Sequence, residues 1–190
     1  PMLLIRHNRI KPPYHDYEAL SIDQLDALAT DKVAPDIAEL PATLPFDEAE
    51  LRGAERFICS YSNRTQQTCA ALSRRFGFKQ SLERDVCLNE LFFVPSQLER
   101  KTDESPLAAV RRNLYAAIAG GSPAVEQAAR LKARMDELLS KYAGKNVVLF
   151  SHGFYMRLVQ SYAASGGDMA RALATIEAFP TVGYLEIRRV

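Results

Sequence analysis

The sequence predicts an α/β sandwich of three layers, with a mainly parallel sheet between two layers of helices. Short apolar runs typical of strands alternate with longer segments of helical spacing, a pattern that indicates a parallel sheet covered by helices. The runs at 58–59 and 147–150 are continuously apolar, as expected for strands buried on both faces. No repeat or linker interrupts the 190 residues, so we expect a single domain over residues 1–190.

Each predicted element has a local signal. The four predicted strands and one weaker candidate are 2–5, 56–60, 146–151, 181–188 and 85–88. The predicted helices are 21–30, 64–76, 107–119, 122–142, 154–164 and 168–175. Ser21 is a good N-terminal cap, and Gly77 is typical of a helix end.

The composition limits the function classes. Apolar residues make up 47% and charged residues 25%, as in an ordinary soluble protein. A net charge of +1 provides no overall field for nucleic acid or an anionic membrane. No run approaches the roughly 20 apolar residues of a membrane span, and the N-terminus lacks the pattern of a signal peptide. We therefore expect a cytoplasmic protein without nucleic-acid or membrane partners.

The three cysteines are Cys59, Cys69 and Cys87. Their odd number and wide spacing match neither a disulfide framework nor a zinc pattern. We expect all three to be buried apolar fillers.

Charged and polar residues follow three of the predicted strands. Arg6 and His7 follow the strand at 2–5, Arg64 lies shortly after the strand at 56–60, and His152 and Gly153 follow the strand at 146–151. Ligands of such sheets bind outside the carboxyl ends of the strands, so these side chains should converge. Two histidines and two arginines would form a positive pocket for a tetrahedral dianion, which is what phosphoryl transfer needs.

Each residue alone has an ordinary alternative. His7 can be a buried structural histidine, and Arg6 can be a surface ion-pair residue. Arg64 opens a helix, where a cation opposes the helix dipole, so either an anionic ligand or an ion pair accounts for it. Gly153 permits close backbone approach, and the helix after it offers unpaired N–H groups to an anion.

At this point the sequence resembles the histidine phosphatase superfamily, the phosphoglycerate mutase-like enzymes, over essentially the whole chain. Four blocks in order carry the resemblance. They are Leu-Ile-Arg-His at 4–7, Ser60-x-x-x-Arg64-x-x-Gln67-Thr68, Leu88-Asn89-Glu90, and Val-Leu-Phe-Ser-His-Gly at 148–153.

The resemblance implies a role for each matching residue. His7 would accept the phosphoryl group, and Arg6, Arg64 and His152 would hold its oxygens. Glu90 would protonate the leaving alcohol as general acid and then activate water as base. The resemblance also implies a metal-independent enzyme with no cofactor. Its partner would be a small phosphorylated metabolite or a phosphoprotein.

The sequence departs from the family pattern after the first histidine. Asn8 stands where the family usually has Gly, and it can both preserve the turn and point an amide toward the phosphate. Arg9 either recognises a second anionic group or faces solvent. His15, in a Pro- and Tyr-rich segment that we expect to form a pocket wall, is either a second acid or a surface histidine.

Several other functions compete with a histidine phosphatase. The segment between Glu90 and His152 is short compared with phosphoglycerate mutases, which favours a phosphatase over a mutase. A catalytically silent module that binds a phosphorylated ligand remains open, with Asn8 and Arg9 as its best arguments. A cysteine phosphatase is excluded, because Cys59 and Arg64 are separated by one residue fewer than that loop needs. The nucleophile motif of serine hydrolases and the phosphate loop of nucleotide-binding proteins are absent.

Overall fold

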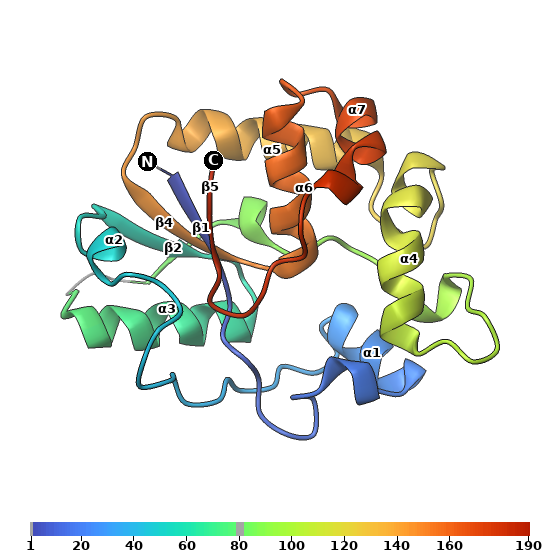
Figure 1. Ribbon diagram of the computed structural model, residues 1–190, viewed down its shortest axis with the longest axis horizontal. Coiled ribbons are helices and arrows are strands. Elements are labelled where there is room, and N and C mark those ends of the chain that lie inside the picture. Colours follow the sequence, from blue (N-terminus) through green and yellow to red (C-terminus); the bar gives the residue numbers. More distant parts are fainter. Residues whose placement is uncertain (1, 79–81) are drawn as a thin grey trace.

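The computed structural model describes residues 2–78 and 82–190, and its centre is a five-stranded sheet within these residues (Figure 1). The strands are β1 (Met2–Arg6), β2 (Arg56–Cys59), β3 (Glu83–Arg84), β4 (Val147–Ser151) and β5 (Ile187–Arg189). Their order is β3-β2-β4-β1-β5, and only the β1–β5 pairing is antiparallel within the described residues. The predicted mainly parallel sheet is confirmed.

Helices cover both faces of this sheet. They are α1 (Ile22–Ala29), α2 (Ala49–Arg52), α3 (Asn63–Phe76), α4 (Pro106–Ala119), α5 (Ala128–Tyr142), α6 (Gly153–Ala164) and α7 (Met169–Ala174). Successive strand residues point to opposite faces. Leu4 and Leu149 therefore join one core with α1 and α4 to α7, whereas Leu3 and Phe150 join a second core with α2 and α3. This is the predicted three-layer sandwich.

Ser21 and Gly77, which were predicted to begin and end helices, do so in the structure. The Ser21 hydroxyl accepts a hydrogen bond from the Gln24 amide, and the Gln24 side chain accepts one from the Ser21 amide, which completes a capping box. Gly77 ends α3 with a left-handed φ of 71°, which glycine adopts at little cost. Most predicted helix ends lie within two residues of the observed ones.

One predicted helix begins too early. The segment predicted as a helix from residue 122 is irregular up to Gln127, and α5 begins at Ala128. Its backbone pairs instead with the segment after Glu90. The Val94 amide donates to the Ala124 carbonyl, and the Glu126 amide donates to the Phe92 carbonyl, both at 2.8 Å. These tertiary bonds replace the first turns of the predicted helix.

The predicted strand at 181–188 is also wrong over most of its length, since β5 covers only Ile187–Arg189. Leu185 has a φ of 57°, which breaks an extended strand. The Leu185 amide donates to the Arg6 carbonyl at 3.1 Å, so the residues before β5 form a turn against the end of β1.

The weaker strand candidate at 85–88 is wrong as well. Strand β3 ends at Arg84, and Val86–Leu88 forms a 3₁₀ helix. The Asp85 side chain accepts a hydrogen bond from the Cys87 amide at 2.9 Å, which caps this turn.

Cys59, Cys69 and Cys87 are free and at most 1% exposed, so their predicted role as buried fillers is confirmed.

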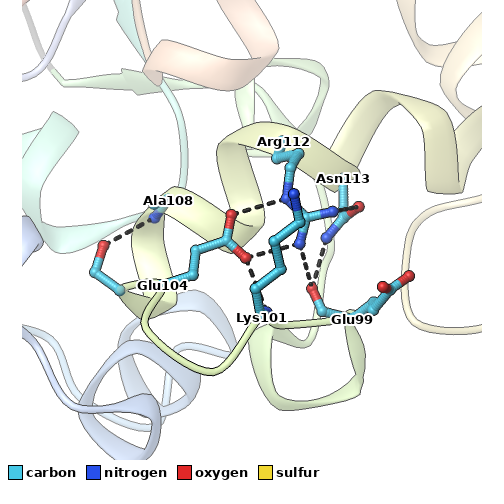
Figure 2. Close-up of polar contacts among 7 residues, drawn as sticks. Glu99, Lys101, Glu104, Ala108, Arg112 and Asn113 are labelled. Carbon is cyan, nitrogen blue, oxygen red and sulfur yellow. Dashed lines mark hydrogen bonds and ion pairs between the residues drawn. The ribbon is translucent and has the colours of Figure 1, made fainter.

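A polar cluster fixes the chain before α4 (Figure 2). Arg112 donates to both oxygens of the Glu104 carboxylate, at 2.8 and 2.7 Å. Arg112 and Asn113 also donate to the Glu99 carbonyl. The arginine fork holds the pKa of Glu104 down at about 2. Arg112 is thus committed to the loop that leads into α4.

Among the described residues, no helix is long and apolar enough to cross a membrane.

Candidate active site

The residues after β1 and β4 meet at the carboxyl edge of the sheet. Arg6 is paired in register with Ser151, so the next residues, His7 and His152, leave neighbouring parallel strands at the same level. The centroids of their imidazole rings lie 5.4 Å apart. The predicted convergence of the two histidines is therefore observed.

His7 is held in one tautomer. It is 2% exposed, and its Nδ1 donates a hydrogen bond to the Asn8 carbonyl at 2.7 Å. A carbonyl only accepts, so Nδ1 carries the proton and Nε2 has the free lone pair. Arg64 Nε donates to that Nε2 at 3.2 Å. Burial, followed by the Arg64 and Arg6 charges, lowers the pKa of His7 well below 6.5, so the ring is neutral at neutral pH.

Arg64 reaches His7 from the first turn of α3. The Ser62 hydroxyl caps this helix by accepting a hydrogen bond from the Thr65 amide at 3.3 Å. One turn later, Thr68 accepts from the Asn8 amide at 2.9 Å and donates to the Arg64 carbonyl at 2.7 Å. This chain of bonds ties the start of α3 to the residue after His7. The Arg64 cation, 8% exposed, is thereby held against the helix dipole.

His152 lies at the N-terminus of α6 and is 1% exposed. Its Nε2 is 2.9 Å from the Ser60 hydroxyl, which in turn lies 2.6 Å from the Thr65 hydroxyl. Burial, followed by the charges of Arg64, His7 and Arg6, lowers the pKa of His152 well below 6.5. The ring is therefore neutral in this structure and can offer one N–H group to an anion.

Two buried nitrogens of this cluster have no protein hydrogen-bond partner among the described residues. They are Arg6 Nε and His152 Nδ1. The Arg6 guanidinium is otherwise fixed, because Nη1 donates to the Val182 carbonyl at 2.6 Å and Cζ lies 4.2 Å from the centroid of the Tyr184 ring. Unpaired buried polar atoms are costly, and a phosphoryl oxygen could pair with both.

Glu90 approaches the histidines from the loop after the 3₁₀ helix Val86–Leu88. Its Oε1 accepts hydrogen bonds from the Tyr155 amide at 2.8 Å and from its neighbour Leu91 at 3.1 Å. These bonds and the nearby Arg64 and Arg6 favour the carboxylate, but burial is the larger effect and raises the pKa of Glu90 above 4.5. A raised pKa suits a group that must donate a proton.

A buried ion pair supports the loop that carries Glu90. Arg134 in α5 donates to the Asn89 carbonyl at 2.6 Å and to the Glu126 carboxylate at 2.9 Å. The same carboxylate accepts from the Phe92 amide at 3.2 Å. The Arg134 and Glu126 side chains are 11% and 7% exposed. The pair thus holds the backbone on both sides of Glu90. Sequence reasoning missed it, because residues 122–127 were predicted to be helical.

Two tyrosines that sequence reasoning also missed surround the cluster. The Tyr184 ring lies 5.8 Å from His7 and 6.1 Å from Tyr17, measured between centroids. Burial raises the pKa of Tyr17 to about 12, so its hydroxyl stays protonated. Tyr184 reaches the site because the C-terminal segment turns instead of extending as a strand. No pattern in the sequence signalled that turn, apart from Gly183.

The cluster opens into one cavity of about 850 Å³. Arg6, Arg64, Glu90, His152 and Gly153 line it, together with Tyr17. His7 does not line the cavity itself, but it contacts Arg64 and His152, which do. Gly153 leaves room for Arg6, since a Cβ at this position would lie 3.3 Å from Arg6 Cζ.

The expectation that Asn8 points its amide at a phosphate is wrong for this structure. The Asn8 amide donates to the Ala38 and Glu39 carbonyls, at 2.9 and 3.3 Å, and so ties down that segment. Asn8 also has no positive φ, so the turn does not need a residue that tolerates one. Arg9 is exposed, with Cζ 5.3 Å from the centroid of the Tyr184 ring.

His15 is exposed, and neither it nor Arg9 lines the cavity. The wall expected from the segment around His15 is instead provided by Tyr17.

In residues 2–78 and 82–190, no group of three or more His, Cys, Asp or Glu side chains is arranged to hold a metal ion. The arrangement is a pair of buried imidazoles and two guanidinium groups, with one carboxyl whose pKa is raised by burial. Such a set can bind a phosphoryl group and exchange protons with it.

The chain is similar to known proteins in sequence and in structure. The model of the histidine phosphatase superfamily (branch 1) matches residues 41–181. A solved mycobacterial glucosyl-3-phosphoglycerate phosphatase with inorganic phosphate superposes with a TM-score of 0.60 at 18% identity, covering 98% of this chain and 86% of that one. The phosphoserine phosphatase of Entamoeba histolytica, in complex with 3-phosphoglyceric acid, gives 0.54 at 12% identity, with 98% and 87% covered.

These two structural similarities show a shared fold. No curated protein sequence matches significantly. The family match covers most of the chain and spans the segments that carry Arg64, Glu90 and His152. The chain therefore belongs to the histidine phosphatase superfamily.

Proposed function

We propose that the chain hydrolyses a phosphate monoester through a covalent phosphohistidine on His7, with Glu90 as general acid and base. The observation that carries this proposal is the 2.7 Å hydrogen bond from His7 Nδ1 to the Asn8 carbonyl. It keeps the proton on Nδ1 and leaves the Nε2 lone pair for attack on phosphorus. Membership of the superfamily and the phosphatases among the similar structures support the same reaction.

In the first step His7 Nε2 forms a bond to phosphorus while the ester P–O bond breaks. Arg64 must release Nε2 before attack, because the lone pair that accepts its N–H at 3.2 Å is the one that reacts. Oxygens of the phosphoryl group would receive that N–H, together with the unpaired nitrogens of Arg6 and His152. Glu90 gives its proton to the leaving alcohol oxygen and becomes a carboxylate.

In the second step a water molecule attacks phosphorus and the P–N bond breaks. The Glu90 carboxylate takes a proton from that water, which returns Glu90 to its acid form and leaves Nε2 with its lone pair. The hydrogen bonds from the Tyr155 and Leu91 amides stabilise the carboxylate between the two steps. No step of this proposal uses a metal ion or an organic cofactor.

The test is to trap the covalent intermediate. After acid or alkaline quench of the enzyme with ³²P-labelled 4-nitrophenyl phosphate, label should remain on His7 in alkali and be lost in acid. His7→Ala should abolish both label and turnover, and a chelator should change neither in the wild type. His15→Ala is the matched control, because His15 is exposed and outside the cavity. Label on another residue, or phosphate binding without turnover, would refute the proposal.

The proposal also covers the partner, the domain organisation and the location of the protein. The partner would be a small phosphorylated metabolite or a phosphoprotein, acted on by a single domain over 1–190 in the cytoplasm. Arg6, Arg64, His152 and Gly153 are proposed to hold the phosphoryl group. Asn8 is left out of this set, because its amide is used by the segment at 38–39.

A further inference from the structure

The cavity is much larger than a phosphoryl site. Its volume of about 850 Å³ lies toward the upper end of small-molecule sites, which range over about 300–1,000 Å³. The phosphoryl group would occupy the part around Arg6, Arg64 and His152. The remaining wall comes from α1, α4, α6, the loop after Glu90 and the segment that leads from residue 123 into α5. Helices α1 and α4 lie to the right of the sheet in Figure 1, away from its strands. This remaining volume is where the alcohol part of a monoester would lie.

The remaining wall is largely apolar. Its principal members are Leu25, Leu28, Leu91, Phe93, Leu107 and Phe154. Apolar side chains also extend to the mouth of the cavity, where Tyr61, Val86 and Phe92 are 55%, 57% and 49% exposed. Among the described residues only one other large apolar side chain, Leu82, is exposed in this way, and it lies outside the cavity. An exposed apolar patch that continues into a cavity is typical of a ligand site.

The polar groups of this wall are mostly occupied by protein partners, apart from Arg130, whose side chain is 82% exposed. Arg111 is paired with Glu18, and Arg134 is paired with Glu126. The Asn89 carboxamide oxygen accepts a hydrogen bond from the Tyr61 amide at 3.0 Å. Arg112, which follows Arg111, donates to Glu104 (Figure 2) and does not line the cavity. A substrate with many hydroxyls would therefore lose water without gaining equivalent hydrogen bonds, and this is costly.

We infer that the substrate is a phosphate monoester of a large apolar alcohol, whose apolar part lies against Leu25, Leu107 and Phe92. This inference rests on the proposed phosphatase function. The phosphoryl end fixes the orientation of the ester, because the charged groups gather at the sheet edge. The apolar wall then supplies binding free energy in proportion to the apolar surface that it covers. Polar esters of similar size bind the same phosphoryl end but gain little from the wall.

The test is a series of n-alkyl phosphates from ethyl to hexyl, each below its micelle concentration. Their leaving alcohols have nearly the same basicity, so the chemical step is constant and kcat/KM reports burial of the chain. A fully buried methylene increases kcat/KM about fourfold, which corresponds to about 0.8 kcal/mol. We expect an increase of at least about tenfold over the series, allowing for partial burial. Hexyl phosphate should also exceed O-phosphoserine and glycerol 3-phosphate.

A matched pair of variants locates the effect. Phe92→Ser removes a half-exposed apolar side chain at the mouth and should lower the ratio of hexyl to ethyl kcat/KM. Leu82→Ser removes a side chain of similar exposure, 42%, outside the cavity and should leave that ratio unchanged. Inhibition by inorganic phosphate should persist in both, which shows that the phosphoryl site is intact.

The possible results are distinguishable. A flat alkyl series, a preference for phosphoserine, or an equal change in both variants overturns the inference but leaves the phosphatase proposal standing. Failure of the wild type to turn over any ester, including 4-nitrophenyl phosphate, overturns both.

Discussion

Replacing Arg134 by methionine should strongly destabilise the protein. Methionine keeps an apolar stem near Tyr155, whose ring centroid lies 4.3 Å from Arg134 Cζ, but it leaves the Glu126 carboxylate without its buried partner. Because the two side chains are only 11% and 7% exposed, solvent screens the pair weakly. Removing one member of a buried pair costs about 3–5 kcal/mol. In a domain of this size that is a decrease in Tm of roughly 6–20 °C, at about 2–4 °C per kcal/mol.

Arg130→Met is the control for this prediction. Arg130 lies on the same helix and faces the same carboxylate, but its side chain is 82% exposed and the closest N–O distance is 3.9 Å. Exposed pairs contribute about 0–1 kcal/mol, so the melting temperature should change little. Adding Glu126→Gln to Arg134→Met should restore part of the lost stability, because the unpaired charge is gone. Equal losses for Arg134→Met and Arg130→Met, in thermal and urea unfolding, would refute the reasoning.

The same variant should also affect turnover at temperatures where it is folded. Arg134 holds the Asn89 carbonyl, and Glu126 holds the Phe92 amide, so the loop that carries Glu90 loosens when the pair is broken. If Glu90 is the general acid, kcat should fall more for alkyl esters than for 4-nitrophenyl phosphate, whose leaving group needs no proton. An unchanged kcat for both esters would indicate that the pair supports stability alone, and a uniform fall would contradict an effect through proton donation by Glu90.

Three further substitutions test the site. Glu90→Gln should lower kcat for alkyl esters about a hundredfold or more. It should also remove the loss of activity expected in the wild type as pH rises through the raised pKa of Glu90 and the acid form is depleted; a pH profile of kcat unchanged by the substitution would contradict this. Gly153→Ala places a Cβ 3.3 Å from Arg6 Cζ. Since a hydrogen bond to a charged group contributes about 1.5–3 kcal/mol, the inhibition constant of inorganic phosphate should increase about tenfold or more, and an unchanged constant would count against Arg6 as a ligand. Ser60→Ala removes the 2.9 Å contact to His152 and, at about 0.5–1.5 kcal/mol, should reduce kcat/KM about twofold to tenfold; full activity would show that Ser62, whose hydroxyl lies 3.4 Å from the same nitrogen, suffices to orient the ring.

The parts of the fold that follow from local patterns were predictable. Parallel strands with continuous apolar runs place His7 and His152 after neighbouring strands, and capping residues set most helix ends. The missed parts depend on tertiary contacts. Tyr184 reaches His7 because Leu185 bonds to the Arg6 carbonyl in a turn.

Glu126 likewise faces Arg134 because residues 122–127 pair with the segment after Glu90. Neither arrangement has a periodic signal, since each depends on a partner far away in the sequence. The side-chain direction of Asn8 was also unpredictable, because its acceptors are backbone carbonyls about 30 residues away.

The hydrogen bond that fixes the tautomer of His7 is accepted by the main-chain carbonyl of residue 8. It therefore does not depend on the side chain at that position. Any residue at position 8 presents the same carbonyl to Nδ1, so the proton stays in place whatever the side chain is. The side chain is left free to serve as a tie to the segment at 38–39. A substitution at position 8 can therefore change the contacts with the segment at 38–39 while Nδ1 of His7 keeps its proton.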